Sequence, residues 1–193
     1  MKKFFVITLL TIFGMTHAQV TFKPGIRAGV NFSHFSKGDG YVYYDGNQYV
    51  TEKDGYNSKT DFYLGFYGAL HLTKYYTLQP ELDYSRQGAI YKGHNNNDDE
   101  QLDISYISLA VTNKFTFTDK FNVHIGPTLD VVTDNNFDAD SDIDVALYLG
   151  VGYNFTKNFG IEARAKTGIV SVAGDGQRNV VFSVGGTYTF DLK

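Results

Sequence analysis

Hydrophobic and polar residues alternate one by one along most of this chain. In residues 145–155 the bulky apolar groups occupy every second position: Val145, Leu147, Leu149, Val151, Tyr153 and Phe155. The residues between them are mostly small or polar. Successive side chains of an extended chain point to opposite faces, so one face of such a segment is apolar and the other is not. The period of two predicts β-strands.

Eight segments have this pattern, and the connections between them alternate in length. The predicted strands are residues 26–33, 63–72, 78–85, 106–115, 121–131, 145–155, 159–169 and 180–190. Short turns lie near residues 73–76, 119–120 and 156–158, and the long polar segments are residues 36–60, 92–101, 133–142 and 170–178. Outer-membrane barrels have the same asymmetry, with short periplasmic turns and longer extracellular loops. The pattern predicts an all-β fold: a monomeric, eight-stranded, antiparallel up-and-down transmembrane β-barrel with both termini at the short-turn end.

Aromatic residues gather near the predicted short turns. They are Tyr75, Tyr76, Phe115, Phe117, Phe121, Phe155, Phe159 and Phe190. Rings of this kind rest in the headgroup zone of a bilayer, so we interpret the group as one aromatic girdle of a barrel. Near the long segments, a second and looser girdle is predicted from Phe35, Phe62, Tyr84 and Tyr91.

A soluble β-barrel or sandwich alternates in the same way, with its apolar face turned inward. Two features favour the membrane alternative: the opposite face is rich in Gly, Ala, Ser and Thr, and the apolar faces end in aromatic residues at a common level. After residue 18 no charge-free stretch exceeds 12 residues. A spanning helix needs about 20 apolar residues, whereas a tilted spanning strand needs only about 9 to 11. A membrane protein built from helices is therefore excluded.

The first 18 residues predict a signal peptide. Lys2 and Lys3 precede the apolar run Phe4–Phe13, and the small residues of Thr16-His17-Ala18 suit a cleavage site. Residues 19–193 are then the barrel domain, with 15 basic and 21 acidic residues and a net charge of −6. An acidic exported protein is a poor candidate for binding nucleic acid. The chain has no Cys, which excludes disulfides and Cys-based metal or redox sites.

The face opposite the apolar one carries charged residues from several predicted strands. They are Arg27, Glu81, Asp83, Lys114, Asp130, Glu162, Arg164 and Lys166. An eight-stranded barrel is only wide enough for side chains to fill it, so we expect these groups to meet inside as one interior polar network. His71 and His124 are candidates to join them. A packed plug is favoured over a conducting pore, because water-filled channels belong to barrels of about 16 or more strands.

Catalysis is the weaker hypothesis for these residues. Glu81 and Asp83 share a face, and His71 and His124 also point inward, so an acid–base or metal site is conceivable. The sequence contains neither a Ser-centred nucleophile elbow nor a His-Glu-x-x-His motif. Polar residues are expected inside a narrow barrel without any catalysis. We expect no enzymatic activity and no cofactor.

One long segment is spaced like the start of a Ca²⁺-binding loop, with oxygen-bearing side chains at alternate positions: Asp134, Asn136, Asp138 and Asp140. Ala139 stands where the turn-forming Gly of such a loop belongs, and Val145 stands where its bidentate Glu belongs. No metal site is therefore expected.

Two other long segments are candidates for contacts outside the protein. The acidic run Asp98-Asp99-Glu100 is interpreted as a solvated loop tip that divalent cations bridge to lipopolysaccharide. The first long segment contains the tyrosines Tyr41, Tyr43, Tyr44, Tyr49 and Tyr56. Tyrosines supply contact area at low entropic cost, so this segment is the best surface for a protein partner. Ordinary solubility with incidental hairpin structure is the favoured account of the segment.

Several motifs resemble the PorT-like outer-membrane β-barrel family, in the family's order. Pro24–Ser33 (PGIRAGVNFS) resembles its opening strand, Leu78–Gly88 its third, Tyr106–Phe115 its fourth and Gly126-Pro127 its fifth. In the fourth, Ser108-Leu109-Ala110 replaces the usual Glu-Ile-Pro and removes one interior acid. The resemblance covers essentially the whole mature chain. It implies an outer-membrane barrel, and some members of that family serve protein secretion.

The C-terminal segment resembles an outer-membrane assembly signal. Gly185, Tyr188 and Phe190 follow its pattern of glycine, two residues, aromatic, one residue, aromatic, and Asp191-Leu192-Lys193 come after it. The resemblance implies recognition by the outer-membrane assembly machinery.

The sequence as a whole predicts a non-enzymatic outer-membrane barrel that is structural or presents its loops at the surface, among outer-membrane lipid and lipopolysaccharide. Two alternatives stay open at this point: a small pore or secretion-associated barrel, and a soluble lipocalin-like barrel whose apolar faces enclose a ligand.

Overall fold

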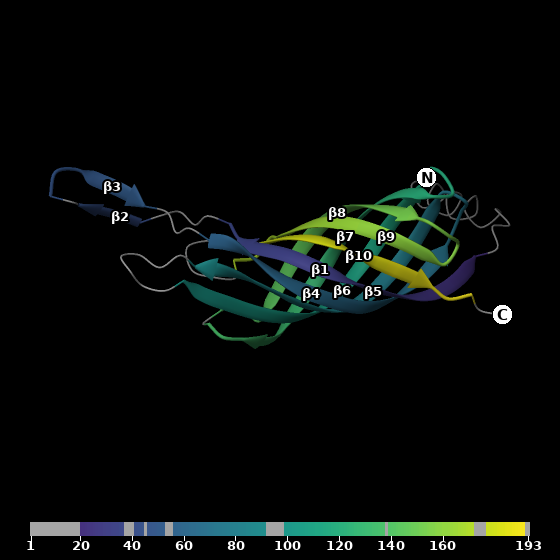
Figure 1. Cartoon of the computed structure of the whole chain (residues 1–193), viewed down its shortest axis with the longest axis horizontal. Coiled ribbons are helices and arrows are strands. Elements are labelled where there is room, and N and C mark those ends of the chain that lie inside the picture. Colours follow the sequence, from purple (N-terminus) through teal and green to yellow (C-terminus); the bar gives the residue numbers. More distant parts are fainter. Residues whose placement is uncertain are drawn as a thin grey trace, which may run out of the picture.

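The fold is a closed, entirely antiparallel β-barrel of eight strands (Figure 1). The computed structural model describes residues 20–36, 41–44, 46–52, 56–91, 99–137, 139–171 and 177–191. The barrel strands are β1 (Thr21–Phe35), β4 (Tyr56–His71), β5 (Tyr76–Tyr91), β6 (Glu100–Thr116), β7 (Phe121–Asn135), β8 (Ile143–Asn154), β9 (Phe159–Gly168) and β10 (Asn179–Thr189). Each strand pairs with its neighbours in sequence, and β1 pairs with β10 to close the sheet. The predicted up-and-down barrel is confirmed.

The long connection between β1 and β4 contains a small sheet of its own. Strands β2 (Tyr41–Tyr44) and β3 (Tyr49–Glu52) pair as a hairpin, and Gly46 in its turn has φ +97°. Glycine adopts such a positive φ without the steric penalty that a Cβ would bring. The hairpin stands beyond the loop end of the barrel (Figure 1), and Tyr49 on it is exposed. Tyr56, by contrast, begins β4 and packs against the ring of Phe35.

The three short turns are built alike, which the sequence analysis did not detect. In each, a threonine hydroxyl accepts hydrogen bonds from the backbone N–H groups two and three residues later. The threonines are Thr73, Thr118 and Thr156, and the third residue along is always aromatic: Tyr76, Phe121 or Phe159. A side chain that satisfies its own turn backbone makes a short connection stable without further packing.

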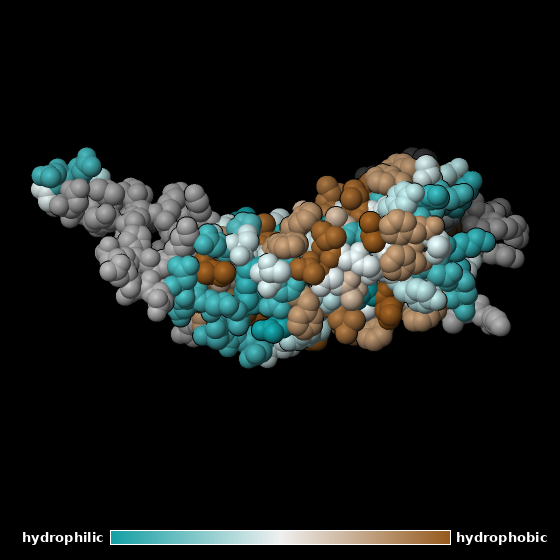
Figure 2. Space-filling model, viewed as in Figure 1, coloured by the Kyte–Doolittle hydropathy of each residue, from teal (hydrophilic) through white to brown (hydrophobic). Residues whose placement is uncertain are grey.

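The apolar faces of the strands point away from the barrel axis. Phe66, Leu109 and Leu149 are 63%, 50% and 56% exposed, whereas the intervening positions are buried. Figure 2 shows these hydrophobic side chains gathered around the half of the barrel nearer the short turns, with hydrophilic residues toward the loop end. This excludes the lipocalin-like alternative, in which the apolar faces would line the interior. In the part of the chain that the structure describes, no helix is long and apolar enough to cross a membrane.

Strands of 15 to 17 residues, such as β5 and β6, exceed the roughly 9 to 11 that a tilted strand needs to span a bilayer. Their additional length carries the barrel wall beyond the hydrophobic zone, as Figure 2 shows at the loop end. The aromatic girdle predicted at the short turns is found there: Phe117, Phe121, Phe155 and Phe159 are exposed, and rings of Phe155 and Phe159 stack at 5.7 Å.

Phe35, a member of the predicted second girdle, points the other way, and the ring of Tyr91, another member, packs against Tyr56 (5.6 Å). Phe35 is 2% exposed and forms, with Ala89, a buried apolar cluster at the loop end of the interior. Partly buried Tyr56, Leu102 and Phe137 pack against it. Phe35 has the same parity along β1 as inward-facing Arg27 and Asn31, so the strand period places it inside. Phe62 and Tyr84 do lie outside, with ring centroids 6.2 Å apart.

Inward-facing glycines make room for the large side chains of this narrow barrel. Gly65 lies opposite Arg27 and Asp83, and Gly185 lies opposite Glu162 and Gly29. A Cβ at Gly65 would overlap the Asp83 carboxylate, and one at Gly185 would overlap the Tyr63 hydroxyl. Alternation of large and small residues is what lets charged side chains fill an eight-stranded interior.

Candidate functional site: a buried ionic network

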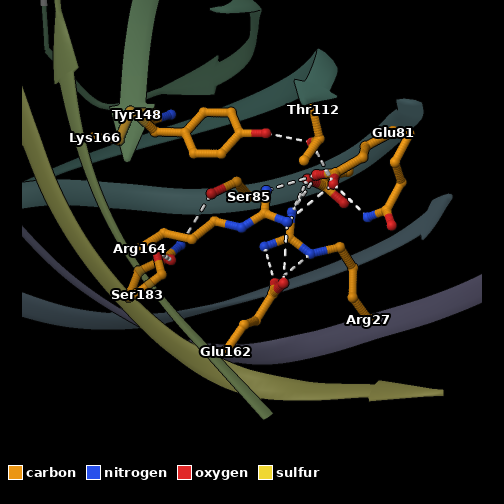
Figure 3. Close-up of polar contacts among 12 residues, drawn as sticks. Arg27, Glu81, Ser85, Thr112, Tyr148, Glu162, Arg164, Lys166 and Ser183 are labelled. Atoms are coloured by element: carbon orange, nitrogen blue, oxygen red, sulfur yellow. Dashed lines mark hydrogen bonds and ion pairs between the residues drawn. The ribbon is translucent and has the colours of Figure 1, made fainter. Parts of the chain in front are cut away.

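Five charged side chains from three non-adjacent strands meet near the middle of the barrel. They are Arg27 from β1, Glu81 and Asp83 from β5, and Glu162 and Arg164 from β9. Each points inward because of the strand period, and each is less than 10% exposed. Figure 3 shows both guanidinium groups lying between Glu162 and Glu81. We refer to these five residues as the ionic network.

Arg27 binds all three carboxylates of the network. Its Nη1 lies 2.9 Å from Glu81 Oε2 and 2.6 Å from Asp83 Oδ2, and its Nη2 lies 2.5 Å from Glu162 Oε1. Its Nε also donates to Glu162 Oε1 (2.8 Å). Only a guanidinium offers five donors in a rigid planar fork, so one side chain can bridge β1 to both β5 and β9.

Arg164 binds two of the same carboxylates from the other side. Its Nη1 and Nη2 donate to the two oxygens of Glu81 at 2.6 and 2.9 Å, and Nη2 also donates to Glu162 Oε2 (3.0 Å). Glu81 accepts further hydrogen bonds from Thr112 Oγ1 (2.6 Å) and Gln79 Nε2 (2.7 Å). Glu81 is thus the most heavily bonded acid of the network.

Lys114 on β6 joins the network through a glutamine. Its Nζ donates to Gln79 Oε1 (2.9 Å), whose amide donates to Glu81. With Lys114 included, three cations stand against three carboxylates. A buried charge without a partner costs several kcal/mol, so a balanced and hydrogen-bonded set is the form in which ionic groups persist in an interior.

Tyrosine rings flank both arginines. The Arg27 guanidinium carbon lies 4.6 Å from the centre of the Tyr63 ring, and that of Arg164 lies 4.7 Å from the Tyr148 ring. The Tyr148 hydroxyl and Thr112 share a short hydrogen bond. A cation over an aromatic face is attracted to it, and more strongly when water is excluded. These rings therefore fix the planes in which the guanidinium groups lie.

The structure divides the predicted single network into separate groups. Lys166 pairs with Asp130 (2.5 Å) nearer the loop end and makes no ion pair with the five central residues. His124 Nε2 lies 3.9 Å from Glu162 Oε2, at the edge of the network. His71 lies at the short-turn end, where its ring bonds to Thr77 (2.9 Å). The predicted interior residues face the lumen, but two ionic centres rather than one hold the charged ones, and His71 lies apart from both.

Other members were missed by the sequence analysis. Gln79, Thr112, Tyr63 and Tyr148 connect or flank the network, and the same alternation that placed Glu81 inward places each of them inward as well. A further cluster lies at the loop end, where Lys59 pairs with Asp61 and Asp103, both at 2.6 Å. Lys59 and Asp61 alternate on β4, but Lys59 falls in the segment predicted as a long connection, and only the sheet brings Asp103 of β6 beside them.

The network separates two cavities along the barrel axis. On its loop side, a cavity of about 50 Å³ is lined by Arg27, Asp83, Arg164 and Lys166, among others. On its short-turn side, a cavity of about 450 Å³ opens between the turns and is lined by Gln79 and Lys114 at its inner end. We call the second one the periplasmic vestibule. Among the described residues, no group of three His or carboxylate side chains is arranged to hold a metal ion.

The C-terminal residues of the predicted assembly signal lie on the last strand and just beyond it. Gly185 faces inward beside Gly29, whereas Tyr188 and Phe190 are exposed, with ring centroids 5.2 Å apart. Phe190 N donates to Pro24 O (2.8 Å), and the next residue, Asp191, pairs with Lys23 (2.7 Å). The ion pair with Lys23 lowers the pKa of Asp191.

A closed barrel with a lipid-compatible exterior, an ionic interior and short turns at one end defines an integral outer-membrane β-barrel protein. Residues 17–174 match the family described as outer membrane protein beta-barrel domain, and the chain belongs to this family. Its place is the bacterial outer membrane, among lipid and lipopolysaccharide. No curated protein matches the chain.

Solved structures share the fold at low sequence identity. Neisserial surface protein A is 16% identical with a TM-score of 0.56, over 86% of this chain and 97% of that one. The attachment invasion locus protein Ail of Yersinia pestis, in complex with the heparin analogue sucrose octasulfate, is 15% identical with a TM-score of 0.52, over 88% and 99%. OprG from Pseudomonas aeruginosa is 14% identical with a TM-score of 0.51, over 90% and 98%. The likeness is one of fold alone.

Proposed function

We propose that the protein is a sealed, non-enzymatic barrel that anchors its extracellular loops at the cell surface. The observation that carries this proposal is the ionic network, in which Arg27 bridges β1 to β5 and β9 and occupies the lumen between the two cavities. The apolar cluster around Phe35 fills the lumen at a second level, nearer the loop end. A lumen filled at two levels offers no continuous aqueous path to an ion.

Conductance across planar bilayers tests the seal. The purified barrel should give no steady single-channel steps at moderate voltage and salt. The triple variant Arg27→Ser, Glu162→Ser, Phe35→Ala, which keeps the charge balance and opens both levels, should conduct after refolding into detergent. Phe35→Ala, which opens only the loop end, should stay silent. Steady unitary steps from the unaltered protein would refute the proposal and favour a small pore.

The absence of enzymatic activity is part of the same proposal. The acids of the network are engaged by two arginines, and Glu81 accepts from Gln79 and Thr112 as well. A general acid or base needs a path for substrate and proton, which a sealed centre does not provide.

We propose in addition that the chain is a PorT-like member of its family. Support comes from the matched opening strand, in which Gly25, Arg27 and Asn31 all face the interior. These are barrel-building positions, so a role in secretion has to be tested directly. Deletion of the gene should reduce the set of proteins exported past the outer membrane, and an unchanged exported set would count against that role.

We further propose that residues 1–18 are a signal peptide and that Gly185, Tyr188 and Phe190 are read by the assembly machinery. The mass and N-terminal sequence of the outer-membrane form should begin at Gln19. The double variant Tyr188→Ala, Phe190→Ala should lower the amount of protein assembled in cells but leave refolding into detergent intact. Phe182→Ala, at an exposed position on the same strand, should leave both assembly and refolding unchanged. Equal assembly of all variants would contradict the signal.

A further inference from the structure

The periplasmic vestibule has a basic lining. Its charged residues are Lys23 on β1, Lys114 on β6, Lys120 in the turn after β6, Lys157 in the turn after β8, and a single acid, Asp119. These cations come from four separate parts of the chain, and barrel closure brings them around one cavity. His71 also lines it. Among the described residues, Asp99, Glu100, Asp134, Asp140 and Asp142 lie at the opposite, loop end of the barrel, so acidic groups at that end stand against the basic periplasmic mouth.

Lys114 stands at the inner end of this cavity with hydrogen-bonding capacity to spare. An ammonium has three N–H donors. Among the described residues, Lys114 Nζ donates one hydrogen bond, to the neutral Gln79 Oε1 (2.9 Å), and forms no ion pair. The three carboxylates that balance its charge lie beyond Gln79, within the network. The network therefore turns its positive end toward the vestibule.

The rim of the vestibule is held in place by hydrogen bonds. Lys23 Nζ pairs with Asp191 (2.7 Å), and Asn158 Nδ2 donates to the same carboxylate (2.9 Å). The Tyr67 hydroxyl shares a hydrogen bond with Thr189 (2.7 Å). Lys120 and Lys157 are exposed on turns that their own threonines stabilise. A rigid rim keeps these two ammonium groups near the cavity without the ordering cost that free loops would bring.

We propose that the vestibule binds a small oxyanion carrying two or more negative charges, through phosphate or carboxylate groups. About 450 Å³ lies within the range of small-molecule sites. Lysines recognise such groups as point charges, and partial enclosure strengthens each attraction relative to bulk water. Hydroxyl and amide donors between them, such as Thr187 and Asn154, complete the lining. The ligand enters from the periplasm, because the network closes the other side.

Calorimetric titration of the detergent-solubilised, full-length protein tests the proposal, with inorganic pyrophosphate and citrate as separate probes. We expect saturable binding of one molecule per barrel that weakens as NaCl is raised. Lys114→Met and Lys157→Met should each weaken it at least tenfold. Lys74→Met is the matched control, because Lys74 lies in the first short turn, over the Tyr75 ring and outside the vestibule lining.

The outcomes separate cleanly. Binding of pyrophosphate alone assigns the phosphate class, binding of citrate alone assigns the carboxylate class, and binding of both assigns a site selective for charge. No saturable binding of either probe overturns the proposal, as does a Lys74→Met effect equal to that of Lys157→Met. Should Lys114→Met fail to fold, Lys157→Met and Lys120→Met still decide it. The result is independent of the sealed-lumen proposal, which conductance tests.

Discussion

Arg27 on β1 and Glu162 on β9 form an ion pair of 2.5 Å across β10, the strand that lies between them. They can meet because the β10 residue opposite Glu162 is Gly185, which has no side chain to separate them. The pair also joins two segments of the chain that are 135 residues apart. Closure of the barrel and formation of the network are therefore the same event at this position.

Two adjacent glycines on β10 should respond very differently to the same change. A Cβ at Gly185 would overlap the Tyr63 hydroxyl and the Ala28 carbonyl oxygen, whereas at Gly186 the nearest atom is a Phe159 ring carbon at 3.7 Å. Gly185→Ala should destabilise the barrel by about 1–3 kcal/mol through overpacking, and Gly186→Ala should be near neutral. Urea unfolding, followed by the gel mobility of unheated samples, measures both. Refolding into detergent without assembly factors keeps this separate from the proposed assembly signal, and equal stabilities would contradict the packing interpretation.

Loss of the guanidinium of Arg27 should lower the stability of the barrel strongly. Arg27→Met leaves three buried carboxylates with two cations, Arg164 and the more distant Lys114, and it removes the ion pair of Asp83; breaking a buried ion pair in this way costs about 3–5 kcal/mol. Arg27→Lys retains the charge but loses the planar fork, so its stability should lie between that of Arg27→Met and that of the unaltered protein. The urea midpoint gives the order, with Lys74→Met as a surface control. If Arg27→Met unfolded at the same midpoint as the unaltered protein, the network would not be a stabilising element.

A charged side chain on the outer surface should lower the free energy of unfolding only within the zone that contacts lipid. Leu109 is 50% exposed in the apolar zone of β6. Leu109→Arg should lower the unfolding free energy in phospholipid vesicles by about 2–4 kcal/mol. Leu109→Ala controls for the lost side-chain volume. A smaller loss for Arg than for Ala would mean that this face does not contact the hydrocarbon.

The ion pair between Lys23 on β1 and Asp191 after β10 should depend on pH at acid values. Lys23 lowers the pKa of Asp191 below the ordinary value of an unfolded Asp. The pair therefore stabilises the folded state above that ordinary pKa, and the contribution is lost as pH falls through the lowered value. An NMR titration of the Asp191 carboxylate should have its midpoint below that of a free Asp, and Lys23→Met should move it upward. If the Lys23→Met variant had the same midpoint as the unaltered protein, the lowered pKa of Asp191 would be due to the hydrogen bond from Asn158 instead.

The strand period predicts much of the candidate site. It also predicts the inward position of Phe35, which the sequence analysis did not use. Parity along each strand places Arg27, Glu81 and Glu162 inside, and the same parity places Phe35 inside, although its position near a loop had suggested a girdle. The three threonine-stabilised turns also repeat a visible motif. By contrast, the clustering of Lys59 with Asp103 has no local signal, because these residues lie on β4 and β6 and only the sheet brings them together.

The sequence by itself determined the number and order of the barrel strands and which residues of each strand share a face, because side-chain alternation and turn length are local properties of an extended chain. That the apolar faces point outward was decided by the tertiary structure. Only the tertiary structure decided which inward residues pair. Lys166 binds Asp130 rather than Glu81, and Lys114 reaches Glu81 through Gln79, because the stagger of the closed barrel sets the height of each residue along the axis. That stagger arises when β1 meets β10, a contact between distant segments that local pattern does not encode.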